Sequence, residues 1–186
     1  MNGLLRQIPN ILSALRLVAA PCTAFLILHH ADGAAVCVFG LAGLSDALDG
    51  FLAKRFALTS QFGAWLDPAA DKLLMLASFV TLTMIGAVPL WLTALVIGRD
   101  AAIVLGVLLA RMLGAPLRIA PLTVGKASTV VQVVYIASIL ALLAADMSLP
   151  RIVFAGVITV AIFTLLSFFG YAYVWLQAVA AGRRAA

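Results

Sequence analysis

Four aspartates in a short stretch are the residues of this sequence best suited to chemistry. Asp46 and Asp49 are three residues apart, and Asp67 and Asp71 are four apart, so each pair would share one face of a helix. A carboxylate within an apolar segment is costly unless it is paired or hydrated, which makes it a functional candidate. Two such pairs in consecutive apolar segments predict one shared acidic site.

The types of side chain around the aspartates indicate a divalent metal and a phosphate ligand. Converging carboxylates repel one another unless a cation is present. Hard oxygen donors without nearby His or Cys favour Mg²⁺ or Mn²⁺ over Zn²⁺, and two such ions can bridge a diphosphate. Gly50 and Gly63 would allow a ligand close to the backbone, and Lys54 and Arg55 offer cations. Alternatively, the aspartates form interfacial ion pairs with Lys54, Arg55 and Lys72.

The elements that position these residues are predicted to be membrane-spanning helices. The chain has 186 residues, of which 65% are hydrophobic and 10% charged, with a mean hydropathy of +1.18. These values exclude an ordinary soluble domain, a disordered chain and a disulfide-rich chain. We expect an all-α, polytopic integral membrane protein that forms a single domain over residues 1–186. The six predicted spans are residues 8–29, 34–54, 68–87, 89–113, 122–145 and 152–178.

The distribution of basic residues predicts the orientation. Arg151 is the basic residue on one side, whereas the other side has the remaining Lys and Arg of the connections and ends. This asymmetry places both termini and the acidic site at the cytoplasmic face, as expected in a bacterial inner membrane. With a net charge of +5, we expect the lipid bilayer as partner and no nucleic acid. The basic residues of the predicted cytoplasmic side are Arg6, Lys54, Arg55, Lys72, Arg111, Arg118, Lys126, Arg183 and Arg184.

Two further features concern the first spans. Arg16 interrupts the apolar core that a signal peptide would need, so we expect the first segment to remain as a span. Cys22 and Cys37 lie in apolar runs, and we expect them to be small buried residues without a disulfide or metal role.

The acidic stretch resembles the signature of the CDP-alcohol phosphatidyltransferase family, Asp-x2-Asp-Gly-x2-Ala-Arg-x8-Gly-x3-Asp-x3-Asp. Every gap is kept, and the one departure is Lys54 in place of Arg. Lysine keeps the charge but loses bidentate phosphate recognition. The matching residues are Asp46, Asp49, Gly50, Ala53, Gly63, Asp67 and Asp71. The resemblance implies an enzyme that transfers the phosphatidyl group of a CDP-linked lipid to an alcohol, with release of CMP.

The resemblance also implies roles for individual residues. Asp46, Asp49, Asp67 and Asp71 would hold two Mg²⁺ or Mn²⁺ ions, and Asp71 would be the general base that takes the proton of the acceptor hydroxyl. The residues implied to contact CDP-diacylglycerol in this stretch are Gly50, Lys54, Ser60 and Gly63.

The first span carries a second element of the same resemblance. Its Pro-Asn-x2-Ser-x2-Arg sequence resembles the family's opening Pro-Asn-x2-Thr-x2-Arg. Asn10, Ser13 and Arg16 follow one another at helical spacing, and the resemblance places them beside the nucleotide of the lipid donor. Alternatively, they form a capped helix entry from which Arg16 reaches the lipid headgroups.

The fourth span contains a charged pair, Arg99 and Asp100, far from both of its ends. Such a pair must face the bundle interior or a hydrated cavity. One interpretation is that Arg99 contacts an acceptor phosphate together with Arg111, Arg118 or Lys126. The other is a buried ion pair that only packs. Residues 125–132 resemble the Gly-Lys-x2-Thr-x2-Gln element of the family's glycerol-acceptor branch.

Two acceptors remain open within that branch. An Arg-Asp pair followed two turns later by the apolar Val107 resembles the CMP-forming cardiolipin synthases, whose acceptor is phosphatidylglycerol. The alternative is a phosphatidylglycerophosphate synthase, which uses glycerol 3-phosphate. The resemblance also implies a homodimer. Two more distant alternatives are a non-catalytic member, because of Lys54, and a small cation transporter that uses the aspartates as a relay.

Overall fold

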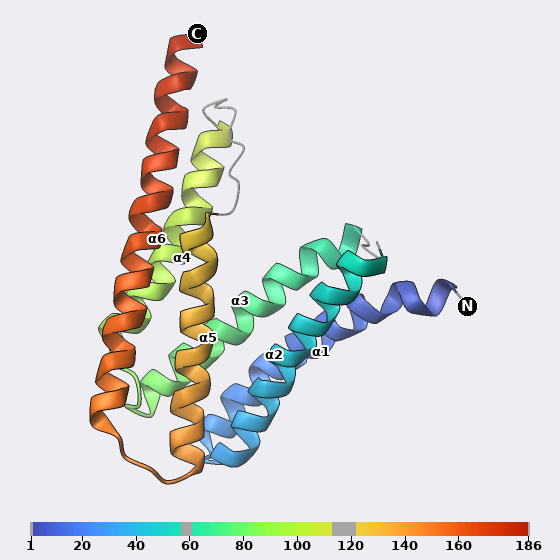
Figure 1. Ribbon diagram of the computed structural model, residues 1–186, viewed down its shortest axis with the longest axis vertical. Coiled ribbons are helices and arrows are strands. Elements are labelled where there is room, and N and C mark those ends of the chain that lie inside the picture. The colour runs from blue at the N-terminus through green and yellow to red at the C-terminus, as the bar shows by residue number, and fades with distance from the viewer. Residues whose placement is uncertain (1, 57–60, 113–121, 186) are drawn as a thin grey trace. The chain divides into compact units, whose positions relative to one another are not determined.

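The computed structural model describes the backbone of residues 2–56, 61–112 and 122–185, and the side chains of residues 12–45, 68–110, 112 and 122–177. Within these ranges the chain forms six α-helices (Figure 1), which confirms the all-α prediction. The helices are α1 (Asn2–Leu28), α2 (Asp32–Phe56), α3 (Gln61–Met84), α4 (Leu90–Met112), α5 (Thr123–Ala144) and α6 (Pro150–Ala185).

Each helix contains most of one predicted span, and three of the described helices are long and apolar enough to cross a membrane. Their apolar stretches are Leu90–Ala110, Thr123–Ala144 and Pro150–Gln177, whereas α1 and α2 have the shorter stretches Leu12–Leu28 and Asp32–Ser45. The helix α3 starts at Gln61, before the predicted span, so Pro68 lies inside it. Proline lacks the N–H that would bond four residues back, so the helix is without this one intrahelical hydrogen bond.

Three turns that join consecutive helices have the same cap. His30, Gly86 and Asp146 adopt positive φ angles of 54°, 79° and 51°. In the first turn the His30 N–H donates to the Ile27 carbonyl (3.1 Å), and in all three the next residue donates to the carbonyl five positions back at 2.9 Å. This is the Schellman motif, which satisfies the last carbonyls of a helix and reverses the chain within a few residues.

The chain forms two compact packing units. The first comprises Met1–Ala87 and Ile136–Leu149, and in it α1 packs against both α2 and α3. The buried side chains of α1 recur every three or four residues, which produces one continuous contact stripe along the helix. They are Ser13, Arg16, Ala20, Thr23 and Ile27. Cys22 and Cys37 are exposed, which corrects the expectation of burial, because each lies between positions of such a stripe.

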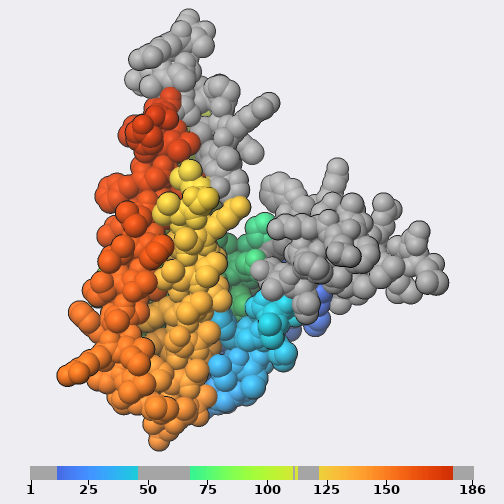
Figure 2. All heavy atoms as spheres, in the orientation of Figure 1, coloured from blue at the N-terminus to red at the C-terminus, as the bar shows by residue number. Residues whose placement is uncertain are grey.

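The second unit comprises Val88–Tyr135 and Pro150–Ala186, and in it α4 packs against α6. The described atoms of the first half of α5 also lie beside α6 (Figure 2), and Gln132 Nε2 donates to Thr164 Oγ1 between them (3.2 Å). The buried face of α6 follows the periodicity of a helix, and two of its five members are polar. They are Val157, Val160, Ala161, Thr164 and Ser167.

Candidate active site

The aspartates of the predicted metal site lie on two helices that both belong to the first unit. Asp46 and Asp49 are one helical turn apart on α2, and Asp67 and Asp71 are one turn apart on α3. Both helices pack against α1. The side chains of Asp46, Asp49 and Asp67 lie outside the described residues, so their convergence stays a prediction.

Asp71 is the acidic residue of this set whose side chain is described, and it pairs with Arg16. Arg16 Nη1 of α1 donates to Asp71 Oδ1 of α3, across 55 residues of sequence. The side chain of Arg16 is 1% exposed and that of Asp71 is 42% exposed. The structure therefore joins the predicted donor-binding face of α1 to the predicted general base. The sequence offered ion pairs of the aspartates with Lys54, Arg55 and Lys72 as an alternative, and Arg16 was not among these partners.

The remaining residues predicted to bind the lipid donor are described only in part. Ser13 is fully buried one turn before Arg16, so these two residues share one face of α1 as their spacing predicted. Asn10, Gly50, Lys54 and Gly63 lie in helices, but their side chains or surroundings fall outside the described residues, and Ser60 falls outside the described backbone.

The donor chemistry of the acidic set fits the metal that the sequence predicts. Its members are carboxylates, and Asp71 keeps nearly half of its surface accessible to an ion. Oxygen donors of this kind are the ligands of Mg²⁺ and Mn²⁺. Asp71 would complete the site from α3 while Arg16 holds one of its oxygens, an arrangement that fixes the direction of the carboxylate.

A second polar cluster surrounds Arg99 in the other unit. The Arg99 side chain is 6% exposed, and it reaches two acceptors: Nη1 donates to Asp100 Oδ1 (2.6 Å), and Nη2 donates to Ser167 Oγ on α6. The guanidinium also lies over the ring of Tyr171, 5.6 Å from its centroid, which is a cation–π distance. Arg99 Nε is buried and has no hydrogen-bond partner among the described residues. The cluster therefore retains an unused donor for an anionic oxygen.

The start of α5 contacts this cluster through Gly125. A Cβ atom at this position would lie 2.9 Å from Tyr171 Oη and 3.4 Å from Arg99 Nη2, so the contact requires glycine. Tyr171 Oη also accepts from the backbone N–H of Leu122 at 3.4 Å. The next residue, Lys126, is exposed. The side chains of Arg111 and Arg118, the other two predicted acceptor cations, lie outside the described residues.

Sequence reasoning missed the partners that α6 supplies. Ser167 and Tyr171 continue the polar stripe begun by Thr164, at intervals of three and four residues within a span of high hydropathy. A polar side chain in an apolar span needs a partner. The periodicity of Thr164, Ser167 and Tyr171 could therefore have indicated that this face of α6 contacts a polar site. Gln132, the last residue of the Gly-Lys-x2-Thr-x2-Gln element, is buried and bonds Ser128 and Thr164, so it ties α5 to α6.

Comparisons with known proteins identify the family of the chain. The family model of CDP-alcohol phosphatidyltransferases matches residues 6–180. A CMP-forming cardiolipin synthase of Streptomyces coelicolor is 44% identical over 115 residues, which cover 59% of this chain and 54% of that protein. The human CMP-forming cardiolipin synthase is 36% identical over 150 residues, 72% of this chain and 50% of the relative.

A third relative has a different name. A probable phosphatidylglycerophosphate synthase of Mycobacterium tuberculosis is 34% identical over 137 residues, 70% of this chain and 64% of that protein. The chain thus spans about half the length of the two cardiolipin synthases. The three long apolar helices and these relatives identify an integral membrane protein. Because the family model covers nearly the whole sequence, the chain belongs to the CDP-alcohol phosphatidyltransferase family.

Proposed function

We propose that this protein transfers the phosphatidyl group of CDP-diacylglycerol to phosphatidylglycerol, which forms cardiolipin and releases CMP. The observation that carries the reaction class is the family match over residues 6–180, which includes every position of the aspartate signature. Two relatives named as CMP-forming cardiolipin synthases support the acceptor.

The surroundings of Arg99 favour a lipid acceptor over glycerol 3-phosphate. Arg99 is one buried cation, and its neighbour Asp100 offsets part of its charge. Two turns later on α4, Val107 lines an apolar cavity and adds no second cation. A phosphodiester with a single negative charge suits this environment better than a dianionic phosphate. Glycerol 3-phosphate remains the second candidate, because the Mycobacterium tuberculosis relative is named as a probable phosphatidylglycerophosphate synthase.

In the proposed reaction an acceptor hydroxyl oxygen attacks the phosphorus of the phosphatidyl group, and the bond from that phosphorus to CMP breaks. Asp71 takes the proton of the hydroxyl, and Arg16 orients its carboxylate through the described ion pair. Bound Mg²⁺ or Mn²⁺, held by Asp46, Asp49, Asp67 and Asp71, would stabilise negative charge on the departing phosphate.

Other residues would bind the two substrates. On the donor side these are Asn10, Ser13, Arg16, Gly50, Lys54, Ser60 and Gly63, and on the acceptor side they are Arg99, Arg111, Arg118 and Lys126. We place all six helices across a bacterial inner membrane, with both termini and the metal site at the cytoplasmic face, and we propose a homodimer.

The test is CMP release by the purified protein with CDP-diacylglycerol and Mn²⁺ or Mg²⁺, with phosphatidylglycerol and glycerol 3-phosphate supplied in separate reactions. We expect release with phosphatidylglycerol that EDTA abolishes. Release confined to glycerol 3-phosphate would replace the acceptor and keep the reaction class. Absence of release with either would contradict the enzyme proposal and favour a non-catalytic member of the family.

The Asp71→Asn variant examines the proposed base within the same assay. We expect a loss of turnover of about 10²- to 10⁴-fold, the usual contribution of a general base, while CDP-diacylglycerol still binds. Unchanged turnover would contradict the role of Asp71 and leave the substrate assignment intact.

A further inference from the structure

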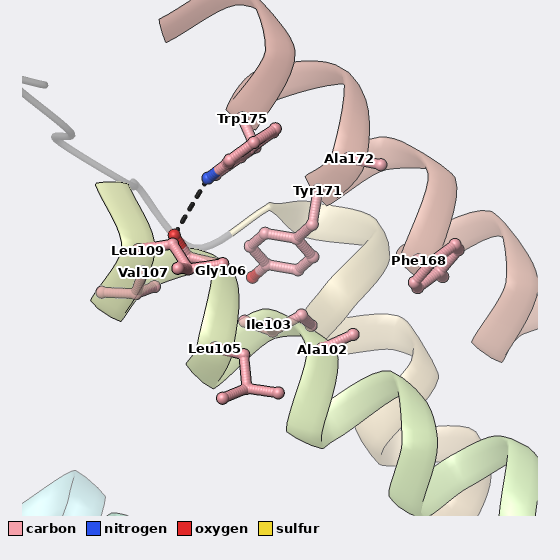
Figure 3. Close-up of a pocket in the computed structure, with 10 residues that line it drawn as sticks. All are labelled: Ala102, Ile103, Leu105, Gly106, Val107, Leu109, Phe168, Tyr171, Ala172 and Trp175. Carbon is pink, nitrogen blue, oxygen red and sulfur yellow. Dashed lines mark hydrogen bonds between the residues drawn. The ribbon is translucent and has the colours of Figure 1, made fainter. Parts of the chain in front are cut away.

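An apolar cavity of about 280 Å³ lies between α4 and α6, next to the Arg99 cluster. Ala102, Gly106 and Leu109 form part of its α4 side, and Phe168, Tyr171 and Trp175 form part of its α6 side (Figure 3). From Ala102 to Leu109 the helix rises by about 10 Å, so the cavity is an elongated slot along the helix axis. Leu109 is 51% exposed, so the slot opens at the molecular surface.

A hydrogen bond joins the two walls of this cavity, which we call the α4–α6 groove. Trp175 Nε1 donates to the Gly106 carbonyl of α4 at 2.9 Å, which Figure 3 shows as the dashed line between the two helices. The indole ring packs against Gly106, where a Cβ would be 3.6 Å from it. This bond ties α6 to α4 beside the groove, so the groove is part of the packed structure of the unit.

Tyr171 is the wall that the groove shares with the Arg99 cluster. Its ring lines the groove, and the Arg99 guanidinium lies 5.6 Å from the centroid of the same ring. Arg99 is buried, and its Nε is without a hydrogen-bond partner among the described residues. A buried cation with an unused donor thus adjoins an elongated apolar slot. This combination complements a molecule with an anionic phosphate and a hydrocarbon chain.

We propose that the α4–α6 groove binds one acyl chain of the acceptor lipid, an anionic glycerophospholipid whose phosphate is held by Arg99. The inference rests on the proposed function and deepens it, since a water-soluble acceptor such as glycerol 3-phosphate has no chain to place there. Lipid tails are as apolar as leucine, so the groove gains nothing by removing a chain from water. It selects by shape, and it holds the acceptor hydroxyl in one position relative to the polar cluster.

A fluorescence experiment tests occupancy without turnover. The full chain carries Trp65, Trp91 and Trp175, and a variant with Trp65→Phe and Trp91→Phe keeps the indole of the groove as the single reporter. Its fluorescence is measured in vesicles that contain phosphatidylglycerol or phosphatidylcholine with brominated acyl chains, which quench indole on contact. We expect stronger quenching by the phosphatidylglycerol, and loss of the difference when Arg99→Gln is added.

A matched pair of variants tests the groove in turnover. Ala102→Leu combined with Ala172→Leu fills it from both helices, whereas Ala101→Leu combined with Ala155→Leu makes the same change at exposed positions outside it. For the filled variant we expect the KM for dioleoyl-phosphatidylglycerol to rise about tenfold. The KM values for short-chain phosphatidylglycerol and for CDP-diacylglycerol should stay unchanged, as should all values of the control pair.

Each other outcome would overturn the proposal in a recognisable way. Equal quenching by both lipids would mean that ordinary bilayer lipid fills the groove. A raised KM for CDP-diacylglycerol alone would assign the groove to the donor. A changed oligomeric state of the filled variant, measured by light scattering in detergent, would assign it to a second copy of the chain. Wild-type turnover with glycerol 3-phosphate alone would contradict the proposed acceptor, whereas normal phosphatidylglycerol turnover by the filled variant would contradict only the groove.

Discussion

Gly125 of α5 lets this helix approach Tyr171 of α6 and Arg99 of α4 closely. Any side chain there would begin 2.9 Å from Tyr171 Oη and 3.0 Å from Tyr171 Cε2, closer than real Cβ contacts. Because the far end of the tyrosine can move, the expected response is a displaced ring and not an unfolded helix. The displaced ring would leave Arg99 without its cation–π partner.

The Gly125→Ala variant should therefore impair binding of the acceptor more than folding. We expect the acceptor KM to rise about tenfold, equivalent to about 1.4 kcal/mol, although alanine favours the helix itself. The measurement is steady-state CMP release at varied acceptor concentration. Gly98→Ala on α4 is the matched control, since a Cβ there meets no atom within 4 Å.

A double variant identifies the cause of this effect. Tyr171→Phe removes Oη, the atom that a methyl group at Gly125 would meet first, so the two substitutions together should cost less than their sum. Strict additivity of the two free-energy changes would show that Gly125 acts through some other contact.

At the residue scale, charged residues that the sequence singled out form ion pairs in the structure, but the sequence did not predict all of their partners. It singled out Arg16, Asp71 and Arg99, and it offered the Arg99–Asp100 pair, which the structure contains. It gave no means to foresee that Arg16 binds Asp71 or that Ser167 binds Arg99, because 55 and 68 residues separate these partners. Such distant pairs depend on which helices pack together, and the spacing of residues within one helix does not predict that.

At the scale of elements, the turn after α3 depends on a single glycine. Gly86 has a φ of +79°, where any residue with a Cβ is strained. His30 and Asp146 occupy the equivalent positions of the other two Schellman caps. Histidine and aspartate are found at positive φ more often than most residues with a Cβ.

Gly86→Ala should destabilise the protein by about 1 kcal/mol, or lower its Tm by about 2–4 °C for a chain of this size. Gly40→Ala in the middle of α2 is the matched control, because its Cβ would meet nothing and alanine favours a helix, so its Tm should rise. Thermal unfolding in detergent, followed by circular dichroism, gives both values. Shifts of the same sign would contradict the strained cap.

Hydropathy predicted the existence of the helices but not the faces on which they pack. Apolar residues lie on both faces of α1: Leu15 and Val18 are 57% and 66% exposed, while Ile27 on the same helix is fully buried. The buried faces are distinguished instead by small and polar residues, such as Ala20 and Thr23, which let the helices approach closely. The helices extend beyond the predicted spans at the starts of α1 and α3 and at the end of α6, since a helix can continue past the apolar region that the hydropathy detects.

At the scale of the whole molecule, the proposed orientation rests on the charges of the connections and on the turns that reverse the chain. The three Schellman turns follow α1, α3 and α5, and in an up-and-down chain such turns fall on one side of the membrane. In the sequence these turns and their flanks contain Arg151 as their basic residue, whereas both ends and the other two connections contain many lysines and arginines. In the proposed orientation, the positive-inside rule would put the three turns outside the cytoplasm.

Cysteine labelling in intact spheroplasts tests this orientation. After Cys22→Ala and Cys37→Ala, which remove the two native thiols, single cysteines are introduced as His29→Cys after α1, as Met147→Cys after α5, or beyond Ala186. His29 and Met147 are exposed in the structure, so a membrane-impermeant maleimide should label both in intact cells, and should label the C-terminal thiol only after lysis. Labelling of one turn without the other would mean that α1 to α5 do not all cross, and C-terminal labelling in intact cells would invert the molecule. Inversion would also move the aspartates of α2 and α3 away from cytoplasmic CDP-linked substrates, so this measurement tests a condition that the proposed reaction requires.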